Sequence, residues 1–488
     1  MSKLPLDAED SLILEFGYKP QFKRVLGLFA DFSLGYSYMS PLAGFYALFA
    51  FALTTAGPAY FWTIPVILFG QVLVALVFAE AASQYPIAGG VYQWARQLVG
   101  ARWGFLTAFM YLLALLATNA GLAYGGAPYL AALFGYAATP ATNAAGALAM
   151  VLIAAFLNFL GIKTLAKGVE AGVWAGLIGF LFAGVYLLIF GRVHPISVLF
   201  DNFGAGAGHY TAALFSASLL GIWIIFGFEA CGDLGEEVQE ASHKIPRAML
   251  LTMLAGGVST LIIALGMTLA VPDMAGAVSG TVANPAEAVL LSSFGSVGAK
   301  LGLITLIIIV VSAAASIMAS TSRLIFSMAR DKLILGHEIL SKIDERRGLP
   351  NGAILAATVI PCLIIMIGIF SSDAITQVIS FATAGIYTAF HMVTGGALYA
   401  RLKGWQPSGQ FKLGAWGMLV NVLALAFGIF MTVNLVWPRT PDAPWYLNYI
   451  NLLSVLLIFV LGLAQLGNVK EASKRATGDL ENPIVDAV

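Results

Sequence analysis

The stretch SLLGIWIIFGFEACGDLGEEVQEASHKIPR, residues 218–247, decides the fold because an apolar run passes directly into a cluster of acids. The run from Leu219 to Phe228 carries no charge, and four carboxylates follow it: Glu229, Asp233, Glu236 and Glu237. Glycine recurs through the same stretch, which disfavours one continuous helix. An interrupted helix in a bilayer is tolerated only where it lines a cavity or is buried in protein. Carboxylates inside the membrane are energetically costly, so we take them by default as belonging to a functional site. We therefore predict a broken transmembrane helix that forms part of a site.

The composition of the whole chain predicts an all-α integral membrane protein. Of its 488 residues, 59% are hydrophobic and 10% are charged, against about 25% charged in soluble proteins. The long apolar runs exclude the alternating strands of a β-barrel. The net charge of zero gives no reason to expect a nucleic-acid partner.

Three further absences in the sequence bound its chemistry. The two cysteines, Cys231 and Cys362, do not indicate a disulfide framework, and the five histidines form no metal-binding pattern. The glycine-rich run Gly204 to Gly208 lacks the lysine of a phosphate loop. We therefore predict no cofactor, no metal and no enzymatic activity. The polar first 24 residues contain no signal peptide, so the first apolar span should direct insertion.

Hydropathy predicts twelve transmembrane spans. They cover 25–54, 62–84, 103–132, 143–161, 168–191, 212–234, 248–271, 298–322, 353–371, 374–400, 415–437 and 446–467. Among the 25 lysines and arginines, only Arg192, Lys300 and Arg439 fall on one side. Because positive residues favour the cytoplasmic side, we expect both termini to be cytoplasmic, in a multi-pass protein of a bacterial inner membrane.

The spans suggest an internal repeat. The polar, helix-breaking patch from Phe32 to Pro41 in span one corresponds to the patch from Gly227 to Gly235 in span six. Each is the first span of a block of five, so the second block would be inverted. The predicted organisation is a cytoplasmic segment 1–24, a first repeat 25–191, a second repeat 212–400, an added pair 415–467 and a cytoplasmic tail 468–488.

Three motifs together resemble the amino acid–polyamine–organocation permeases. They are AEAASQYPIAGGVYQWA (79–95), GFE (227–229) followed by EE (236–237) and IPRAM (245–249), and SRLIFSMARD (322–331). Their order agrees with the family over roughly residues 25 to 400. The details resemble the branch that transports choline, γ-aminobutyrate, ethanolamine and related amines. The resemblance implies a LeuT-like fold: a five-plus-five inverted repeat in which helices one and six are discontinuous at the substrate, with two added spans.

Two features depart from the family pattern. The stretch from Leu34 to Tyr38 has one glycine and bulky rings where many members have a glycine-rich break, which argues against a carboxylate-binding nest. Span five has no lysine beyond Lys167, so lysine-based coupling is not expected; the matching position is about Gly176.

We expect the substrate to bind where the two interrupted helices meet. The predicted substrate-binding residues are Ser33, Gly35, Tyr36, Ser37, Tyr38, Trp223, Phe226, Gly227, Phe228 and Glu229. Aromatic faces attract ammonium or guanidinium groups by about 0.5–2 kcal/mol. Trp223 is the candidate gate, although each ring could equally serve in packing.

The acids have alternative roles. Glu229 could carry a proton in a low-dielectric site, or it could cap backbone amides that the break sets free. Asp233 could be a second coupling or gating acid, or an N-cap of the following half-helix. Glu236 and Glu237 should meet the basic cytoplasmic loop. Glu80 should pair with Arg96 or Arg102, or gate the cytoplasmic side.

Other polar residues in the spans also have two interpretations. Ser312 and Ser316, with carbonyls near Ser33 to Tyr36, could bind sodium, or could permit close helix packing. His391 could relay protons or bond two helices.

The resulting hypothesis is a secondary active transporter that imports a small amine-bearing solute by alternating access, coupled to protons. The candidate solutes are an amino acid, choline, γ-aminobutyrate, ethanolamine and a guanidine- or urea-like compound. A sodium-coupled symporter or an amino acid exchanger of the same fold is the alternative. A membrane-embedded enzyme and a channel are the rival classes.

Overall fold

The computed structural model describes residues 8–478, except 207, 345, 371 and 440–443. In this part of the chain the regular structure is helical, and the extended pairing is limited to two isolated bridges. The helices are α1 (Ala8–Glu15), α2 (Leu28–Met39), α3 (Pro41–Ala56), α4 (Thr63–Gln84), α5 (Gly90–Val99), α6 (Ala101–Phe134), α7 (Pro140–Phe159), α8 (Ile162–Tyr186), α9 (Tyr210–Ala217), α10 (Leu219–Ile224), α11 (Ala230–Asp233), α12 (Ala241–Leu269), α13 (Met274–Ser279), α14 (Pro285–Arg330), α15 (His337–Leu340), α16 (Asn351–Ile367), α17 (Ser372–Leu402), α18 (Gly417–Val436), α19 (Trp445–Asn448) and α20 (Ile450–Gly478). Short 3₁₀ or π turns lie at Gly57–Trp62, Leu187–Gly191, Ile196–Phe200, Gly235–Glu237 and Gly414–Trp416.

Within the described residues, nine helical segments are long and apolar enough to cross a membrane. The first, Leu28–Gln84, is 57 residues long and contains α2, α3 and α4. Two shorter apolar helices, Tyr210–Ile224 and Asn351–Ile367, coincide with predicted spans six and nine. The all-helical prediction is therefore confirmed, and each predicted range overlaps a helix.

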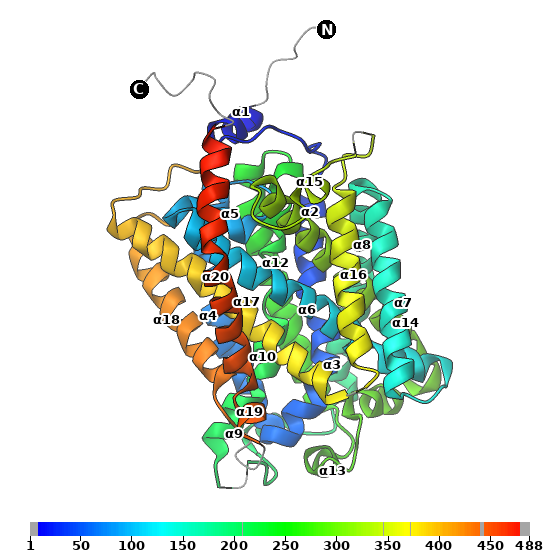
Figure 1. The fold of residues 1–488 in the computed structure, drawn as a ribbon. Helices are drawn as coiled ribbons and strands as arrows, with labels where there is room; N and C mark the ends of the chain where they lie inside the picture. The colour runs from blue at the N-terminus through cyan, green and yellow to red at the C-terminus, as the bar shows by residue number, and fades with distance from the viewer. Residues whose placement is uncertain (1–7, 207, 345, 371, 440–443, 479–488) are drawn as a thin grey trace.

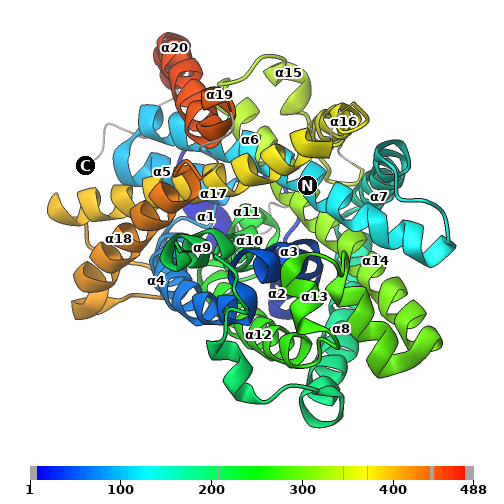
Figure 2. The ribbon, with the colours of Figure 1, turned by 90° about the horizontal axis from the view of Figure 1, so that it is seen from below.

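The long helices stand side by side in one bundle (Figure 1). α1, α5, α15 and the end of α20 lie at one end, which we call the α5 end, and α9, α13 and α19 lie at the other (Figure 1). α6 runs through the interior, since 78% of its most apolar 18-residue stretch is buried. α20 is peripheral, with 11% of the corresponding stretch buried (Figure 2).

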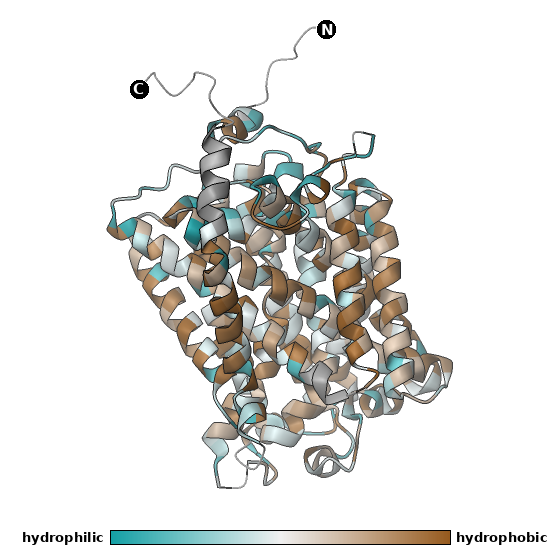
Figure 3. Cartoon of the chain, viewed as in Figure 1, coloured by the Kyte–Doolittle hydropathy of each residue, from teal (hydrophilic) through white to brown (hydrophobic). Residues whose placement is uncertain are grey.

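Apolar residues cover the outside of the bundle between its two ends (Figure 3). Large side chains such as Phe156 and Phe182 are exposed there, as lipid-facing residues would be. Trp416 and Trp437 flank the two ends of α18 and are also exposed. Exposed tryptophans at both ends of a hydrophobic helix are typical of membrane interfaces.

Span one is interrupted at Ser40, between α2 and α3. Ser40 has left-handed backbone angles (φ 40°, ψ 61°), and Pro41 starts α3. Proline lacks an N–H donor and disfavours the helical conformation of the residue before it, so the helix breaks here. The break thus lies within the predicted helix-breaking patch from Phe32 to Pro41, at its end. The stretch Leu34 to Tyr38, which was compared with the family's break, lies within α2.

Span six is interrupted as predicted. α10 ends at Ile224 and α11 begins at Ala230, and Gly227 between them has a φ of 118° that other residues rarely adopt. A second irregularity separates α11 from α12, where Glu240 is left-handed (φ 49°). Glu229 immediately precedes α11, and the other acids of the opening stretch lie between Ala230 and the start of α12: Asp233, Glu236, Glu237 and Glu240.

Candidate functional site

The two helix breaks touch each other through their backbones. A Cβ atom on Gly227 would lie 2.6 Å from the backbone nitrogen of Met39 and 3.0 Å from the carbonyl carbon of Tyr38. The absence of a side chain at Gly227 therefore allows the unwound segment of span six to lie against the end of α2. This contact places the residues of both breaks around one point in the bundle.

We predict that Gly227→Ala destabilises the protein and abolishes transport. The methyl group would meet the Met39 backbone, and alanine at φ 118° is strained, for a combined cost of about 1–3 kcal/mol or more. Thermal unfolding and uptake in proteoliposomes measure the two effects. Gly404→Ala is the control, because Gly404 also has a positive φ but no atom within 4 Å of the added Cβ. Equal losses in both variants would contradict the close-packed break.

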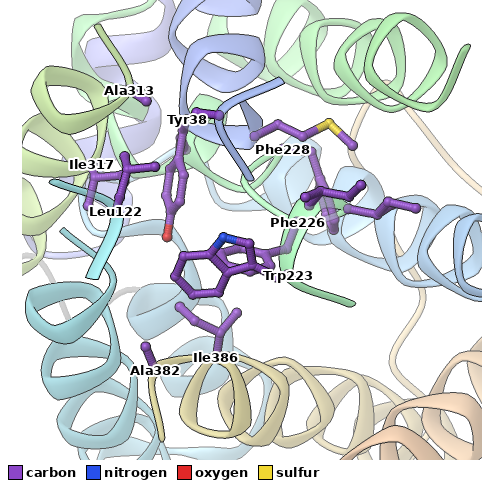
Figure 4. Close-up of a cluster of buried hydrophobic side chains, with 14 of the residues drawn as sticks. Tyr38, Leu122, Trp223, Phe226, Phe228, Ala313, Ile317, Ala382 and Ile386 are labelled. Atoms are coloured by element: carbon purple, nitrogen blue, oxygen red, sulfur yellow. The ribbon is translucent and has the colours of Figure 1, made fainter. Parts of the chain in front are cut away.

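An aromatic cluster lies at the junction of the breaks (Figure 4). The Phe226 ring makes edge contacts with Tyr38 and Trp223, with ring centres 6.0 and 5.8 Å apart. Leu122 of α6, Ala313 and Ile317 of α14, and Ala382 and Ile386 of α17 complete the cluster (Figure 4).

The buried Tyr38 hydroxyl is the polar atom of this cluster. It lies near the Tyr111 hydroxyl and the Glu229 carboxylate, without a hydrogen bond of standard geometry within the described chain. Apolar and aromatic side chains around a few convergent polar atoms are typical of a small-molecule site. Tyr38, Trp223 and Phe226 are thus brought together as predicted.

Two of the acids share one tyrosine. The Tyr111 hydroxyl lies 3.3 Å from Glu229 Oε1 and 3.1 Å from Asp233 Oδ2, and both acids are fully buried. A phenol has one hydrogen to donate, so it satisfies one carboxylate at a time. The Asp233 carboxylate also lies at the N-terminus of α5, near the Val91 N–H and the Ser320 hydroxyl. Tyr111, in the middle of the third predicted span, was missed because tyrosine is common in this chain.

The structure bears on the alternatives for these acids. Glu229 Oε2 accepts a hydrogen bond from the Gly227 backbone N–H at 2.8 Å, so Glu229 does cap the break, and a proton-carrying role stays a prediction. Asp233 is not an N-cap: it ends α11, and Glu240 precedes α12. The capping interpretation of Asp233 is therefore wrong, because the chain makes a further irregular turn before α12 starts.

Other predicted site residues make packing or polar contacts with neighbouring helices, including Phe228 at the edge of the cluster in Figure 4. Tyr36 donates a hydrogen bond to Ser259 at 3.0 Å on α12. A Cβ on Gly35 would lie 2.6 Å from Cys231 Sγ, so Gly35 is a packing position. Phe228 packs between Phe78 and Phe390, with ring centres 5.8 and 5.7 Å away.

The two predicted serines of α2 are buried. The Ser33 hydroxyl has no hydrogen-bond partner in the part of the chain described. Ser37 lines a small cavity between the α2–α3 break and α8, together with Ser40. Because both serines lie in a regular helix, their backbone amides are not released toward a substrate.

The predicted sodium ligands are only partly placed as expected. Ser316 has a buried hydroxyl without a partner among the described residues, whereas Ser312 packs against Gly172 of α8. The carbonyls near Ser33 to Tyr36 lie within α2, and that of Tyr36 accepts the Ser40 N–H at 2.9 Å. That part of the prediction is wrong, because the break lies later, at Ser40.

An ion-pair layer closes the α5 end. Arg323 donates to both carboxylate oxygens of Glu237, at 2.7 and 3.3 Å, and Arg330 pairs with Glu236 at 2.9 Å. Both arginines belong to the motif SRLIFSMARD at the end of α14, where the basic cytoplasmic connection was predicted to begin. The prediction that Glu236 and Glu237 meet basic residues of this region is therefore confirmed.

Glu80 has a different partner from the predicted one. It pairs with Arg401 at the end of α17 and accepts the Leu413 N–H at 2.9 Å. Arg96 pairs with Asp331 instead, and Arg102 is exposed. The predicted ion pair of Glu80 is therefore present, but its partner differs, because α4 packs beside α17 and α18, which bring a distant arginine closer than those of the adjacent loop.

His391 is engaged between helices. Its Nδ1 lies 3.2 Å from the Thr432 hydroxyl, so this histidine links α17 to α18. This geometry fits the interpretation of His391 as a helix-to-helix hydrogen bond.

The N-terminal segment lies across the same end. The N–H groups of Val25 and Leu26 both donate to the Glu237 carbonyl at 2.9 Å. The Tyr18 hydroxyl donates to Asp331 at 3.0 Å, and the Arg330 guanidinium lies 4.0 Å from the centre of the Tyr18 ring. The segment therefore links the start of α2 to the end of α14.

Comparisons with known proteins agree with this architecture. A family model described as amino acid permease matches residues 26–461. Amino-acid permease BAT1 of Arabidopsis thaliana is 25% identical over 485 residues, covering 91% of each chain. Amino-acid permease 2 of Neurospora crassa is 24% identical, covering 93% of this chain and 87% of its own.

A solved structure has the same fold. The crystal structure of an Eremococcus coleocola manganese transporter mutant aligns with a TM-score of 0.58 and 16% identity, over 92% of this chain and 95% of that one. The chain is thus an integral membrane transporter and not an enzyme. Its match over most of its length shows that it belongs to the amino acid permease family, within the amino acid–polyamine–organocation superfamily.

Proposed function

We propose that this transporter imports a small amine-bearing solute by alternating access. The observation that carries the proposal is the junction of the two breaks, where Tyr38, Trp223 and Phe226 pack together and where Glu229 and Asp233 share the Tyr111 hydroxyl. Aromatic faces and carboxylates both attract a cationic ammonium group.

The names of the relatives favour an amino acid as the solute. The N-terminus of α3 supports this choice, because Ser40 does not cap it with its side chain and its first N–H groups have no helical acceptor. A helix N-terminus favours an anion such as a carboxylate. We propose that the amino acid carboxylate binds at Leu42 and Ala43 and its ammonium group at the aromatic cluster.

We propose proton coupling through Glu229, Tyr111 and Asp233. Two fully buried carboxylates joined by one phenol avoid a large electrostatic cost when one of them is protonated. Sodium coupling is the alternative, favoured by the unpartnered Ser316 hydroxyl on α14.

For the topology we propose twelve spans and cytoplasmic termini. Segment Leu28–Gln84 is long enough for two crossings, and the two shorter apolar helices would complete the set. The breaks at Ser40 and Gly227 then fall in the first spans of two inverted repeats, 25–191 and 212–400. The arginines at the α5 end support a cytoplasmic position for that end.

A matched ligand panel tests the proposed solute. We expect γ-aminobutyrate and α-amino acids to raise the melting temperature of the purified protein, and butyrate, which lacks the amine, to leave it unchanged. Uptake of a stabilising solute into proteoliposomes should rise when an inward proton gradient is imposed. Stabilisation by butyrate as well would contradict amine recognition, and equal uptake with and without the gradient would exclude proton coupling.

A further inference from the structure

Asp31 is a buried carboxylate that neither the substrate site nor the ion-pair layer uses. It lies in the first turn of α2, its side chain is 0% exposed, and neither carboxylate oxygen has a hydrogen-bond partner among the described residues. An ionised carboxylate in such a place costs several kcal/mol at least, and usually neutralises instead. Binding a proton would remove this cost while the residue stays buried.

The immediate neighbours of Asp31 offer little to an anion. The Cys231 thiol of α11 donates a weak hydrogen bond to the Asp31 backbone carbonyl at 3.5 Å. Thr252 of α12 donates to the Phe32 carbonyl at 3.5 Å and lies 3.8 Å from Cys231 Sγ. Gly35, one turn later on α2, has no side chain to contribute.

The charged and titratable groups on the helices packed against α2 are engaged or exposed elsewhere. α8, α11, α12 and α14 pack on α2. On α14, Arg323 and Arg330 pair with Glu237 and Glu236. On α12, Lys244 pairs with Glu240, His243 is half-exposed and Arg247 is exposed. On α8, Lys163 and Lys167 are exposed and Glu170 is half-exposed, and at α11 Glu229 and Asp233 contact Tyr111. No counter-charge for Asp31 is thus present in the described part of the chain.

The start of α2 is held closed by separable contacts. Leu26 and Val25 bond to the Glu237 carbonyl, and Phe22 packs on Phe326 with ring centres 5.0 Å apart. If these contacts release, the first turn of α2 leaves α11 and α12, and water reaches Asp31. A hydrated aspartate has an ordinary pKa near 3.9 and loses its proton at neutral pH.

We propose that Asp31 is a proton-binding site whose occupancy is tied to closure of the α5 end. Closing takes up one proton, which neutralises the carboxylate as it is buried, and opening returns that proton to water. By linkage, acid favours the closed state, and alkali favours the open state. This proposal goes beyond the transport cycle, since it concerns the opening equilibrium even without substrate.

Other groups in the closing contacts do not explain such a dependence near neutral pH. Burial, together with the neighbouring Asp331 carboxylate, raises the pKa of the Tyr18 phenol, so this group stays neutral. Arginine side chains keep their charge throughout this pH range. His243 is half-exposed and lies outside these contacts, and the Asp31 variant below separates its contribution.

The alkylation rate of Cys231 measures the proposed opening. Cys231 is fully buried beside Asp31, so a thiol reagent should reach it only in the open state. The protein is placed in nanodiscs in a Cys362→Ser background without substrate, and each rate is divided by that of a model thiol. Where opening is rare, we expect the corrected alkylation rate to rise about tenfold per pH unit. In the Asp31→Asn variant, we expect this corrected rate to be independent of pH.

Two comparisons decide the outcome. Asp344→Asn is the control, because Asp344 lies in the α15–α16 connection and is bonded to backbone N–H groups there, so its slope should equal that of the parent protein. A flat profile in the parent protein overturns the proposal whether or not the Asp31 variant folds. Equal slopes in the parent and in Asp31→Asn overturn it too. The assay needs no solute, so failure of the proposed amine transport would not change its result.

Discussion

Replacing Glu229 with glutamine should abolish accumulation driven by a proton gradient while leaving exchange of solute across the membrane intact. Glutamine has the same size, and its amide oxygen can still accept the Gly227 N–H that now bonds to Oε2 at 2.8 Å. The backbone break therefore keeps its cap. The variant has no titratable group at this position, and so it cannot link protonation to occupancy.

Proteoliposome assays distinguish the two roles of Glu229. Uptake under an inward proton gradient should fall to the level seen without a gradient, whereas counterflow of labelled solute should remain. Glu338→Gln is the matched control, since Glu338 is an exposed residue of α15 and should leave both rates unchanged. Gradient-driven accumulation that survives in Glu229→Gln would leave only the capping role.

Glu237→Gln should be the most destabilising of the conservative changes at the α5 end. Its carboxylate pairs with Arg323, and the exposed fractions of the two side chains are 2% and 1%. Removing one partner of a buried pair leaves an uncompensated charge, which typically costs about 3–5 kcal/mol. The Glu237 carbonyl also holds Val25 and Leu26, so the closed N-terminal segment should loosen as well.

Thermal unfolding measures this loss, with labelling of the two native cysteines as the signal that reports unfolding. Glu240→Gln is the control. Glu240 lies only three residues after Glu237 and pairs with Lys244, but its side chain is 70% exposed, so little change is expected. Replacing both Glu237 and Arg323 with methionine should recover much of the stability, because the unpaired charge is then gone. If Glu237→Gln and Glu240→Gln unfold at the same temperature, the buried pair does not stabilise the closed end.

The acids differ in how well the sequence predicts their partners. Glu236 and Glu237 were expected to meet basic residues at one end of the bundle, and they meet Arg330 and Arg323. Glu80 was assigned to the wrong arginine, because its partner Arg401 is 321 residues away in the chain. Sequence distance gives no measure of which helix ends pack together.

Two site features were not found from the sequence at all. Tyr111 is one of 17 tyrosines, and nothing in its local sequence marks it as the residue between two carboxylates. Asp31 did carry a usable signal, since it is an acid close to the start of an apolar span. Its lack of partners, however, is a property of α2, α11 and α12 packed together.

The sequence by itself determined the all-helical membrane class, the position of most helices and the break at Gly227. These features depend on local hydropathy and on the backbone preferences of glycine and proline. The same local preferences end α2 at Ser40, directly before Pro41. The tertiary structure decided which groups pair with the acids and which acid has no partner among the described residues. In a low-dielectric interior, a charge interacts strongly with whichever polar group lies beside it, and that neighbour is set by the packing of distant helices.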